Sequence, residues 1–108
     1  MAGRSQATND DTVTAPRTGT RPKVVKPELY KVLLHNDDYT TMDFVIQVLM
    51  TVFHHETEQA TRIMLNVHEH GVGVAGAYPY EIADTKARKV MELARAAEFP
   101  LLCTIEAE

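Results

Sequence analysis

Two groups of residues in this 108-residue chain could together bind a positively charged amino group beside a bulky apolar group. The first is a run of amide and carboxylate side chains, Asn36, Asp37 and Asp38. The second has i, i+3 and i+4 spacing, which places its members on one face of a helix: Met64, Val67 and His68. Acceptors at the mouth of an apolar cavity suit a ligand with an ammonium group next to an apolar side chain. The spacing also allows another interpretation, in which Met64 and Val67 only pack in the core and His68 forms a local hydrogen bond.

A glycine run matches the G-x-G-x-x-G pattern of dinucleotide-binding proteins at Gly71, Gly73 and Gly76. A dinucleotide site requires these glycines after a strand and at the start of a helix. Here they would follow a helix and lead into a strand. We therefore interpret the run as a helix cap followed by a strand whose missing side chains leave room for a neighbouring helix.

The histidines and the single cysteine do not predict a metal site or a catalytic centre. His54 and His55 are adjacent and His68 and His70 are two residues apart, so neither pair shares a helical face. Cys103 falls in a predicted core strand, where a thiol behaves as a small apolar group. A single cysteine also excludes a disulfide framework. Because no Ser–His–Asp or Cys–His set can be recognised, we predict a protein that is not an enzyme and binds no metal or cofactor.

Hydrophobic periodicity predicts the elements that position these side chains. Apolar residues alternate over 28–35, as is typical of a strand with one buried face. Asx residues then favour a turn, and a helix begins at Thr40 or Thr41, with Asp43 as the capping-box partner of Thr40. The expected elements are a strand at 28–35, helices from 40 or 41 to about 55 and at 56–70, a strand at 72–78, a helix at about 81–98 and a strand at 101–105. This β-α-α-β-α-β order predicts an α+β two-layer sandwich, a small antiparallel sheet with three helices on one face.

The net charge of −4 conceals a split along the chain. Residues 1–27 carry five basic and two acidic side chains and lack any periodic apolar pattern, so we expect a disordered N-terminal extension. Residues 28–108 form the predicted domain and carry six basic and thirteen acidic side chains. An acidic domain argues against nucleic-acid binding, which depends on neutralising phosphates. No apolar run is long enough to cross a membrane, and no secretory signal is visible, so we expect a cytoplasmic protein.

Four motifs in the same order resemble those of the ClpS adaptor family. They read YKVLLHNDDYTTMDFV over 30–45, ATRIMLNVH over 60–68, EIADTK over 81–86 and PLLCTIE over 100–106. The resemblance implies a bacterial adaptor of the N-degron pathway, similar in fold to the C-terminal domain of the ribosomal stalk protein. Such an adaptor binds proteins whose first residue is Leu, Phe, Tyr or Trp. It delivers them to a ClpA-type AAA+ unfoldase that works with the ClpP peptidase.

The resemblance also implies roles for particular residues. The residues that would hold the substrate's α-ammonium group are Asn36, Asp37 and His68, with Asp38 in the turn near them. Those that would line the side-chain pocket are Leu34, His35, Thr40, Met42, Val45, Met64, Val67 and Leu101. Glu81 and Lys86 would dock on the N-terminal domain of the unfoldase, and residues 1–27 would correspond to the family's mobile extension. We expect a monomer, because the adaptor acts one-to-one with its partner.

Two positions depart from the usual pattern of the family. His35 stands where an aliphatic residue is common, and Thr41 stands where a proline commonly follows the threonine. On the pocket wall, His35 would add polarity and change the preference among first residues; pointing to solvent, it would have no effect. An alternative function is a ribosome-associated or structural interaction module of similar fold without an ammonium site.

Overall fold

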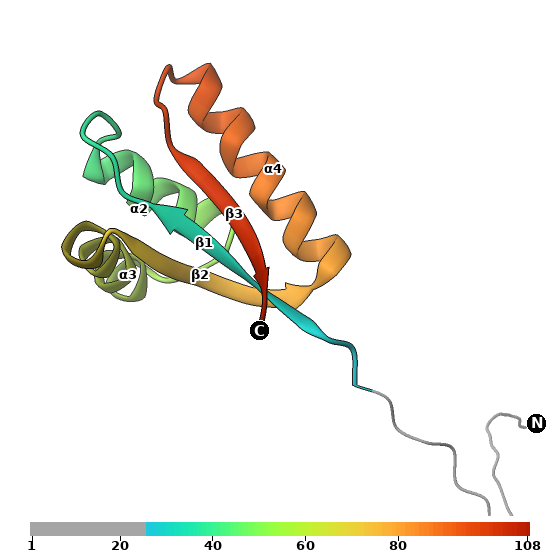
Figure 1. The fold of residues 1–108 in the computed structure, drawn as a ribbon. Helices are drawn as coiled ribbons and strands as arrows, with labels where there is room; N and C mark the ends of the chain where they lie inside the picture. The colour runs from blue at the N-terminus through green and yellow to red at the C-terminus, as the bar shows by residue number, and fades with distance from the viewer. Residues whose placement is uncertain (1–25) are drawn as a thin grey trace, which may run out of the picture.

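The computed structural model describes residues 26–108 (Figure 1). The predicted extension over 1–27 therefore lies almost entirely outside the described residues. The elements are β1 (Leu29–His35), α2 (Met42–Thr51), α3 (Thr57–His70), β2 (Val72–Pro79), α4 (Tyr80–Ala96) and β3 (Leu102–Ala107). This arrangement confirms the predicted β-α-α-β-α-β order.

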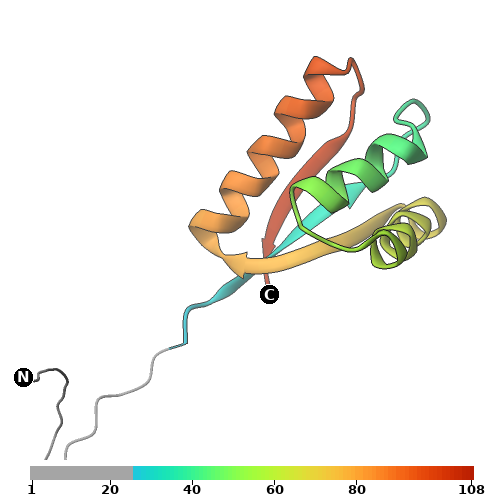
Figure 2. The same cartoon turned by 180° about the vertical axis from the view of Figure 1, so that it is seen from behind.

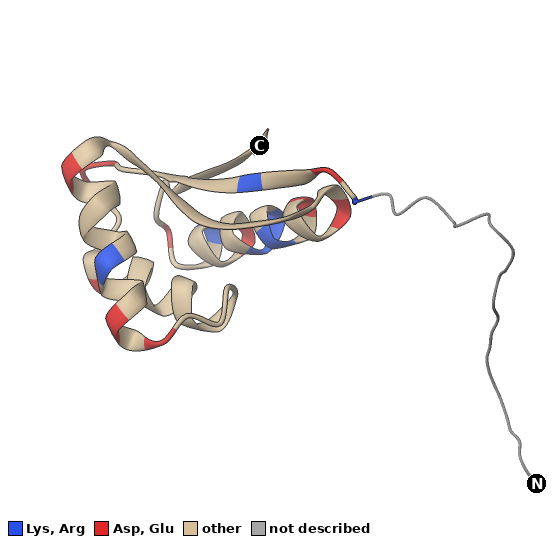
Figure 3. Ribbon diagram, turned by 90° about the horizontal axis from the view of Figure 1, so that it is seen from below, with Lys and Arg blue, Asp and Glu red and all other residues tan. Residues whose placement is uncertain are grey.

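The strands form one antiparallel sheet in the order β2-β1-β3, so β1 lies in the centre. The helices all cover one face of the sheet, in front of it in Figure 2 and beneath it in Figure 3. Val32 and Leu34 of β1 are fully buried on the helical side, where they form the core with residues from α2, α3 and α4. The predicted α+β architecture is confirmed.

The start of α2 differs from the predicted capping box. Thr41 is the N-cap, and its Oγ1 accepts a hydrogen bond from the amide of Phe44 at 3.1 Å. Thr40 does not cap the helix, because its amide and hydroxyl both donate to Asp37. A threonine at the cap satisfies one of the helix's free amides, so α2 is capped at its start without a proline at position 41.

Contacts from His55 and Gly73 set the position of α3 on the sheet. His55 Nε2 donates to the carbonyl of Ala75 at 2.6 Å. Ala75 is the extra residue where the register between β1 and β2 shifts, so its backbone does not follow the regular ladder. At Gly73, an added Cβ would lie 2.7 Å from Cγ2 of Val67, so the absent side chain allows α3 to approach β2 closely.

The glycine run is therefore a structural feature and not a dinucleotide site. Gly71 ends α3 with a φ of 87°, a left-handed conformation that favours glycine, and its amide donates to the carbonyl of Val67 at 2.8 Å. The chain then enters β2, with no helix start at the glycines. The interpretation as a cap followed by a strand with room for a helix is confirmed.

Candidate functional site

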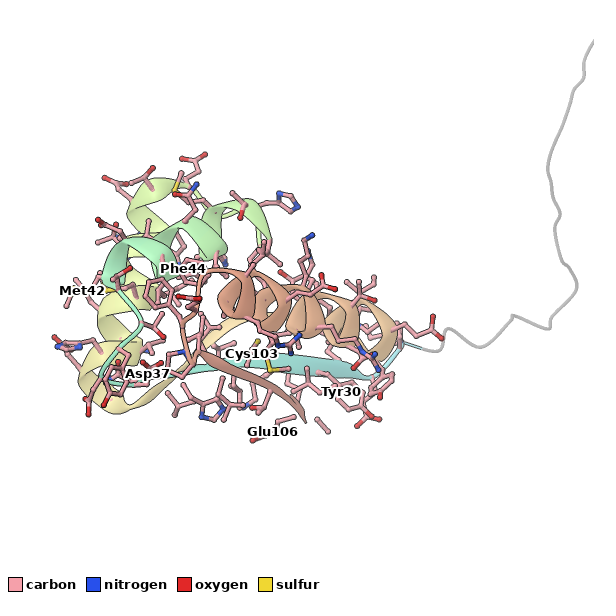
Figure 4. The ribbon with its side chains drawn as sticks, turned by 90° about the horizontal axis from the view of Figure 1, so that it is seen from above. Tyr30, Asp37, Met42, Phe44, Cys103 and Glu106 are labelled. Atoms are coloured by element: carbon pink, nitrogen blue, oxygen red, sulfur yellow. The ribbon has the colours of Figure 1, made fainter. Side chains whose placement is uncertain are left out.

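A cavity of about 410 Å³ opens between the turn that follows β1, the start of α2 and the side of α3. Its lining residues are Asn36, Asp37, Asp38, Tyr39, Thr40, Thr41, Met42, Val45, Met64, Val67 and His68. The structure thus brings together the two groups of side chains that the sequence analysis singled out. Figure 4 shows Asp37 and Met42 at the same end of the molecule.

The cavity has an apolar floor and a polar mouth. Val45, Met64 and Val67 are buried in the core and still line the cavity, so they form its floor. Asn36 and His68 are exposed at its mouth. Met64 and Val67 therefore pack in the core and border the cavity at the same time.

Asp37 organises the turn at the mouth. Its Oδ1 accepts hydrogen bonds from the amides of Tyr39 at 2.8 Å and Thr40 at 2.7 Å, and its Oδ2 accepts from the Thr40 hydroxyl at 2.7 Å. Partial burial acts to raise the pKa of this carboxyl, but the hydrogen bonds from Thr40 and Tyr39 together outweigh burial and lower the pKa. Asp37 is therefore a fixed, ionised acceptor. A carboxylate has about four lone-pair positions, so it retains capacity for a ligand.

Backbone contacts place Asn36 beside the end of α3. The amide of Asn36 donates to the carbonyl of Gly71 at 2.9 Å, which joins the turn to the C-terminal cap of the helix. His68 lies in the last turn of α3 and lines the same cavity. Among the residues that the structure describes, none forms a hydrogen bond with the His68 ring, so the local bond considered above is not formed. The imidazole is available to a ligand.

Three residues expected in the pocket do not line the cavity. Leu34 and Leu101 are buried in the core. His35 points to the opposite face of the sheet, where its Nε2 lies 2.8 Å from Oγ1 of Thr104 on β3. Successive strand residues face opposite sides of a sheet, so Leu34 and His35 cannot border one cavity on the helical side. The departure at His35 consequently adds no polarity to the cavity.

Tyr39 and Thr41 line the cavity although the sequence analysis did not place them there. The sequence feature that could have predicted this position is the Asx residue Asp37. A carboxylate that binds amides two and three residues ahead wraps the chain around it, and this brings the following residues to the rim.

Lys86 and Glu81 lie on α4, away from the cavity. The Lys86 ammonium donates to the carbonyl of Val52 at 2.7 Å and lies 5.7 Å and 5.2 Å from the ring centroids of Phe53 and Tyr78. Lys86 therefore ties the end of α2 to α4. Glu81 is exposed in the first turn of α4.

The remaining chemistry-bearing groups do not form a site. Burial raises the pKa of the Cys103 thiol to about 12, so it is protonated and unreactive. Over residues 26–108 the structure contains no cluster of metal-ligating side chains. Within the same range, no helix is long and apolar enough to cross a membrane.

A family model described as "ATP-dependent Clp protease adaptor protein ClpS" matches residues 25–104. A ClpS protein of Maricaulis maris is 53% identical over 104 residues, covering 93% of this chain and 95% of that relative. One from Syntrophus aciditrophicus is 57% identical over 84 residues, covering 78% of each. Among solved structures, Agrobacterium tumefaciens ClpS2 bound to L-phenylalaninamide is 42% identical with a TM-score of 0.74, covering 77% of this chain and all of that one.

The fold and the cavity define a small α+β domain built to bind a ligand at one end of its sheet. The chain belongs to the ClpS family of Clp protease adaptors.

Proposed function

We propose that this adaptor binds proteins through a free α-amino group and a bulky first residue, Leu, Phe, Tyr or Trp, and delivers them to a ClpA-type unfoldase of the ClpAP protease. The observation that carries the proposal is the cavity with its apolar floor and its mouth of Asn36, Asp37 and His68. The related ClpS2 bound to L-phenylalaninamide supports it, because that ligand has a free amino group beside an aromatic side chain. An interaction module without an ammonium site would not require this polar mouth.

In this proposal the α-ammonium group donates to Asp37, Asn36 and His68. The carboxylate supplies a charge-assisted hydrogen bond, which is stronger than a neutral one. The amide oxygen of Asn36 and the imidazole of His68 accept the other protons. Asp38, which also lines the cavity, adds negative potential that attracts an incoming amino terminus.

The first side chain enters the cavity and rests on Val45, Met64 and Val67. Met64 and Met42 are flexible and polarizable, which lets one cavity accept aliphatic and aromatic groups. Met42 stands at the rim and is 47% exposed. A first residue that branches at Cβ places bulk at this rim and is rejected by steric clash.

A peptide titration tests this function. A labelled peptide that begins with Phe or Leu binds, while its N-acetylated form binds at least about tenfold more weakly, because acetylation removes the charge and the donors. A peptide that begins with Ile also binds more weakly than the Leu peptide. Fluorescence anisotropy measures all of these affinities. Equal binding of the free, acetylated and Ile peptides would refute an ammonium-dependent adaptor.

Delivery requires a second surface, and we place it on α4 with Glu81 and Lys86 as contacts for the N-terminal domain of the unfoldase. Glu81 is exposed, whereas the Lys86 ammonium is already bound to Val52. Peptide-bond cleavage belongs to the partner protease, and the adaptor acts as a monomer in the bacterial cytoplasm. This surface and the cavity use separate residues.

Replacing Glu81 with Ala therefore weakens binding to the unfoldase domain and leaves the affinity for a Phe peptide unchanged. The matched control is Glu92→Ala, because Glu92 is also an exposed carboxylate on α4. Pull-down of the unfoldase domain and peptide anisotropy measure the two activities separately. If Glu81→Ala and Glu92→Ala behave alike in both assays, Glu81 is not a docking residue.

A further inference from the structure

Tyr39 is a large side chain at the cavity mouth whose exposure is not explained by the fold. Tyr39 lines the cavity, but 76% of the residue is exposed to solvent. Within residues 26–108 its hydroxyl forms no hydrogen bond. An exposed aromatic ring beside a binding cavity is a common place for a ligand contact.

The Tyr39 backbone is nevertheless fixed. Its amide donates to Asp37 Oδ1 at 2.8 Å, the same carboxylate that we assign to the α-ammonium group. The backbone position from which the Tyr39 ring extends is therefore fixed relative to the bound amino terminus. A contact surface that is held in place before binding loses less entropy when a ligand arrives.

The geometry of a bound peptide leads its second residue to this rim. The first residue sends its side chain into the cavity and its ammonium group to the mouth, so its Cα must lie at the opening. The next Cα lies about 3.8 Å further along the chain, outside the cavity. Tyr39 and Met42 are the large apolar side chains at this opening; the other exposed lining residues are polar: Asn36, Asp38, Thr41 and His68.

From this geometry we infer that the Tyr39 ring contacts the side chain of the substrate's second residue and makes the adaptor prefer an apolar or aromatic residue there. The inference rests on the proposed function, since it assumes an amino terminus bound at Asp37. Met42 lies in the first turn of α2 and is only 47% exposed, whereas Tyr39 leaves most of its surface free for a contact.

A double-mutant cycle tests the inference with Phe-Leu and Phe-Ala peptides that are otherwise identical. The original protein binds Phe-Leu about three- to tenfold more tightly than Phe-Ala, as expected for one aromatic contact. Tyr39→Ala weakens only Phe-Leu and so removes the difference, while Tyr39→Phe keeps it because the ring remains. Thermal unfolding confirms that each variant is folded.

Tyr80→Ala is the matched control. Tyr80 is an exposed tyrosine that packs against Tyr30 with ring centroids 5.2 Å apart. Figure 4 shows Tyr30 at the end of the molecule opposite Asp37. This variant keeps the preference for Phe-Leu. Equal affinities of the original protein for the two peptides, or uniform weakening of both by Tyr39→Ala, would overturn the inference while the proposed function stands. Failure to bind either peptide would instead refute the proposed function.

Discussion

Replacing Asp37 with Asn lowers the affinity for a Phe peptide by about 1.5–3 kcal/mol, or roughly one to two orders of magnitude. The reason is the loss of the negative charge that faces the substrate's α-ammonium group. The turn survives in this variant. In the original protein the amides of Tyr39 and Thr40 donate hydrogen bonds to Asp37 Oδ1, and an Asn side chain keeps one oxygen that can accept them. Isothermal titration calorimetry with the free peptide measures the change.

Asp43→Asn is the control for net charge. It removes one carboxylate from the first turn of α2, close to the cavity but outside its lining. Its affinity for the Phe peptide therefore remains close to that of the original protein. If the Asp37 and Asp43 variants lose the same affinity, the effect comes from the general field of the acidic domain, and Asp37 does not contact the ammonium group.

The lowered pKa of Asp37 also fixes the sign of a pH effect on stability. A carboxyl whose pKa is lower in the folded state stabilises the fold above its unfolded pKa, and this contribution is lost as pH falls through the folded pKa. The difference in unfolding free energy between the original protein and Asp37→Asn therefore shrinks as the pH falls from the unfolded pKa of the carboxyl through its lower folded pKa. Urea unfolding at several pH values over this interval would show the convergence.

The cavity could be predicted from sequence because its two halves are local patterns. The run Asn36 to Asp38 must follow the strand, and the spacing of Met64, Val67 and His68 fixes one helical face. Their meeting needed a tertiary contact, the hydrogen bond from the Asn36 amide to Gly71. The α3 cap and the turn after β1 are far apart in the chain. Periodicity alone therefore could not decide whether the two groups meet at a cavity or whether the helical face only packs in the core.

The wall of the pocket was harder to predict than its mouth. The resemblance to the family implied that Leu34 and His35 both line the pocket, but alternation along β1 places them on opposite faces of the sheet. Similarly, the sequence does not reveal that Lys86 donates to a carbonyl 34 residues away, at Val52. Such a contact depends on where the fold places α4 relative to the end of α2. The sequence therefore predicts elements and faces better than it predicts which side chain completes a site.

Replacing Gly73 with Ala has a large expected effect on stability and binding, because Gly73 lies directly behind the cavity floor. A Cβ at this position would lie 2.7 Å from Cγ2 of Val67, which is closer than side-chain carbons approach in proteins. Val67 is β-branched and has few rotamers with which to relieve the contact. In Gly73→Ala, Val67 therefore moves toward the cavity, and overpacking lowers the unfolding free energy by about 1–3 kcal/mol. Urea denaturation measures this loss.

A smaller cavity changes the selection of the first residue as well as stability. Gly73→Ala loses more affinity for a Phe peptide than for a Leu peptide, because the larger ring needs the space that Val67 has taken. Gly76→Ala is the matched control on the same strand: its added Cβ would meet the hydroxyl end of Tyr78, which does not line the cavity. It therefore leaves the ratio of Phe to Leu affinity unchanged. An unchanged ratio in Gly73→Ala would mean that α3 shifts as a whole and Val67 does not enter the cavity.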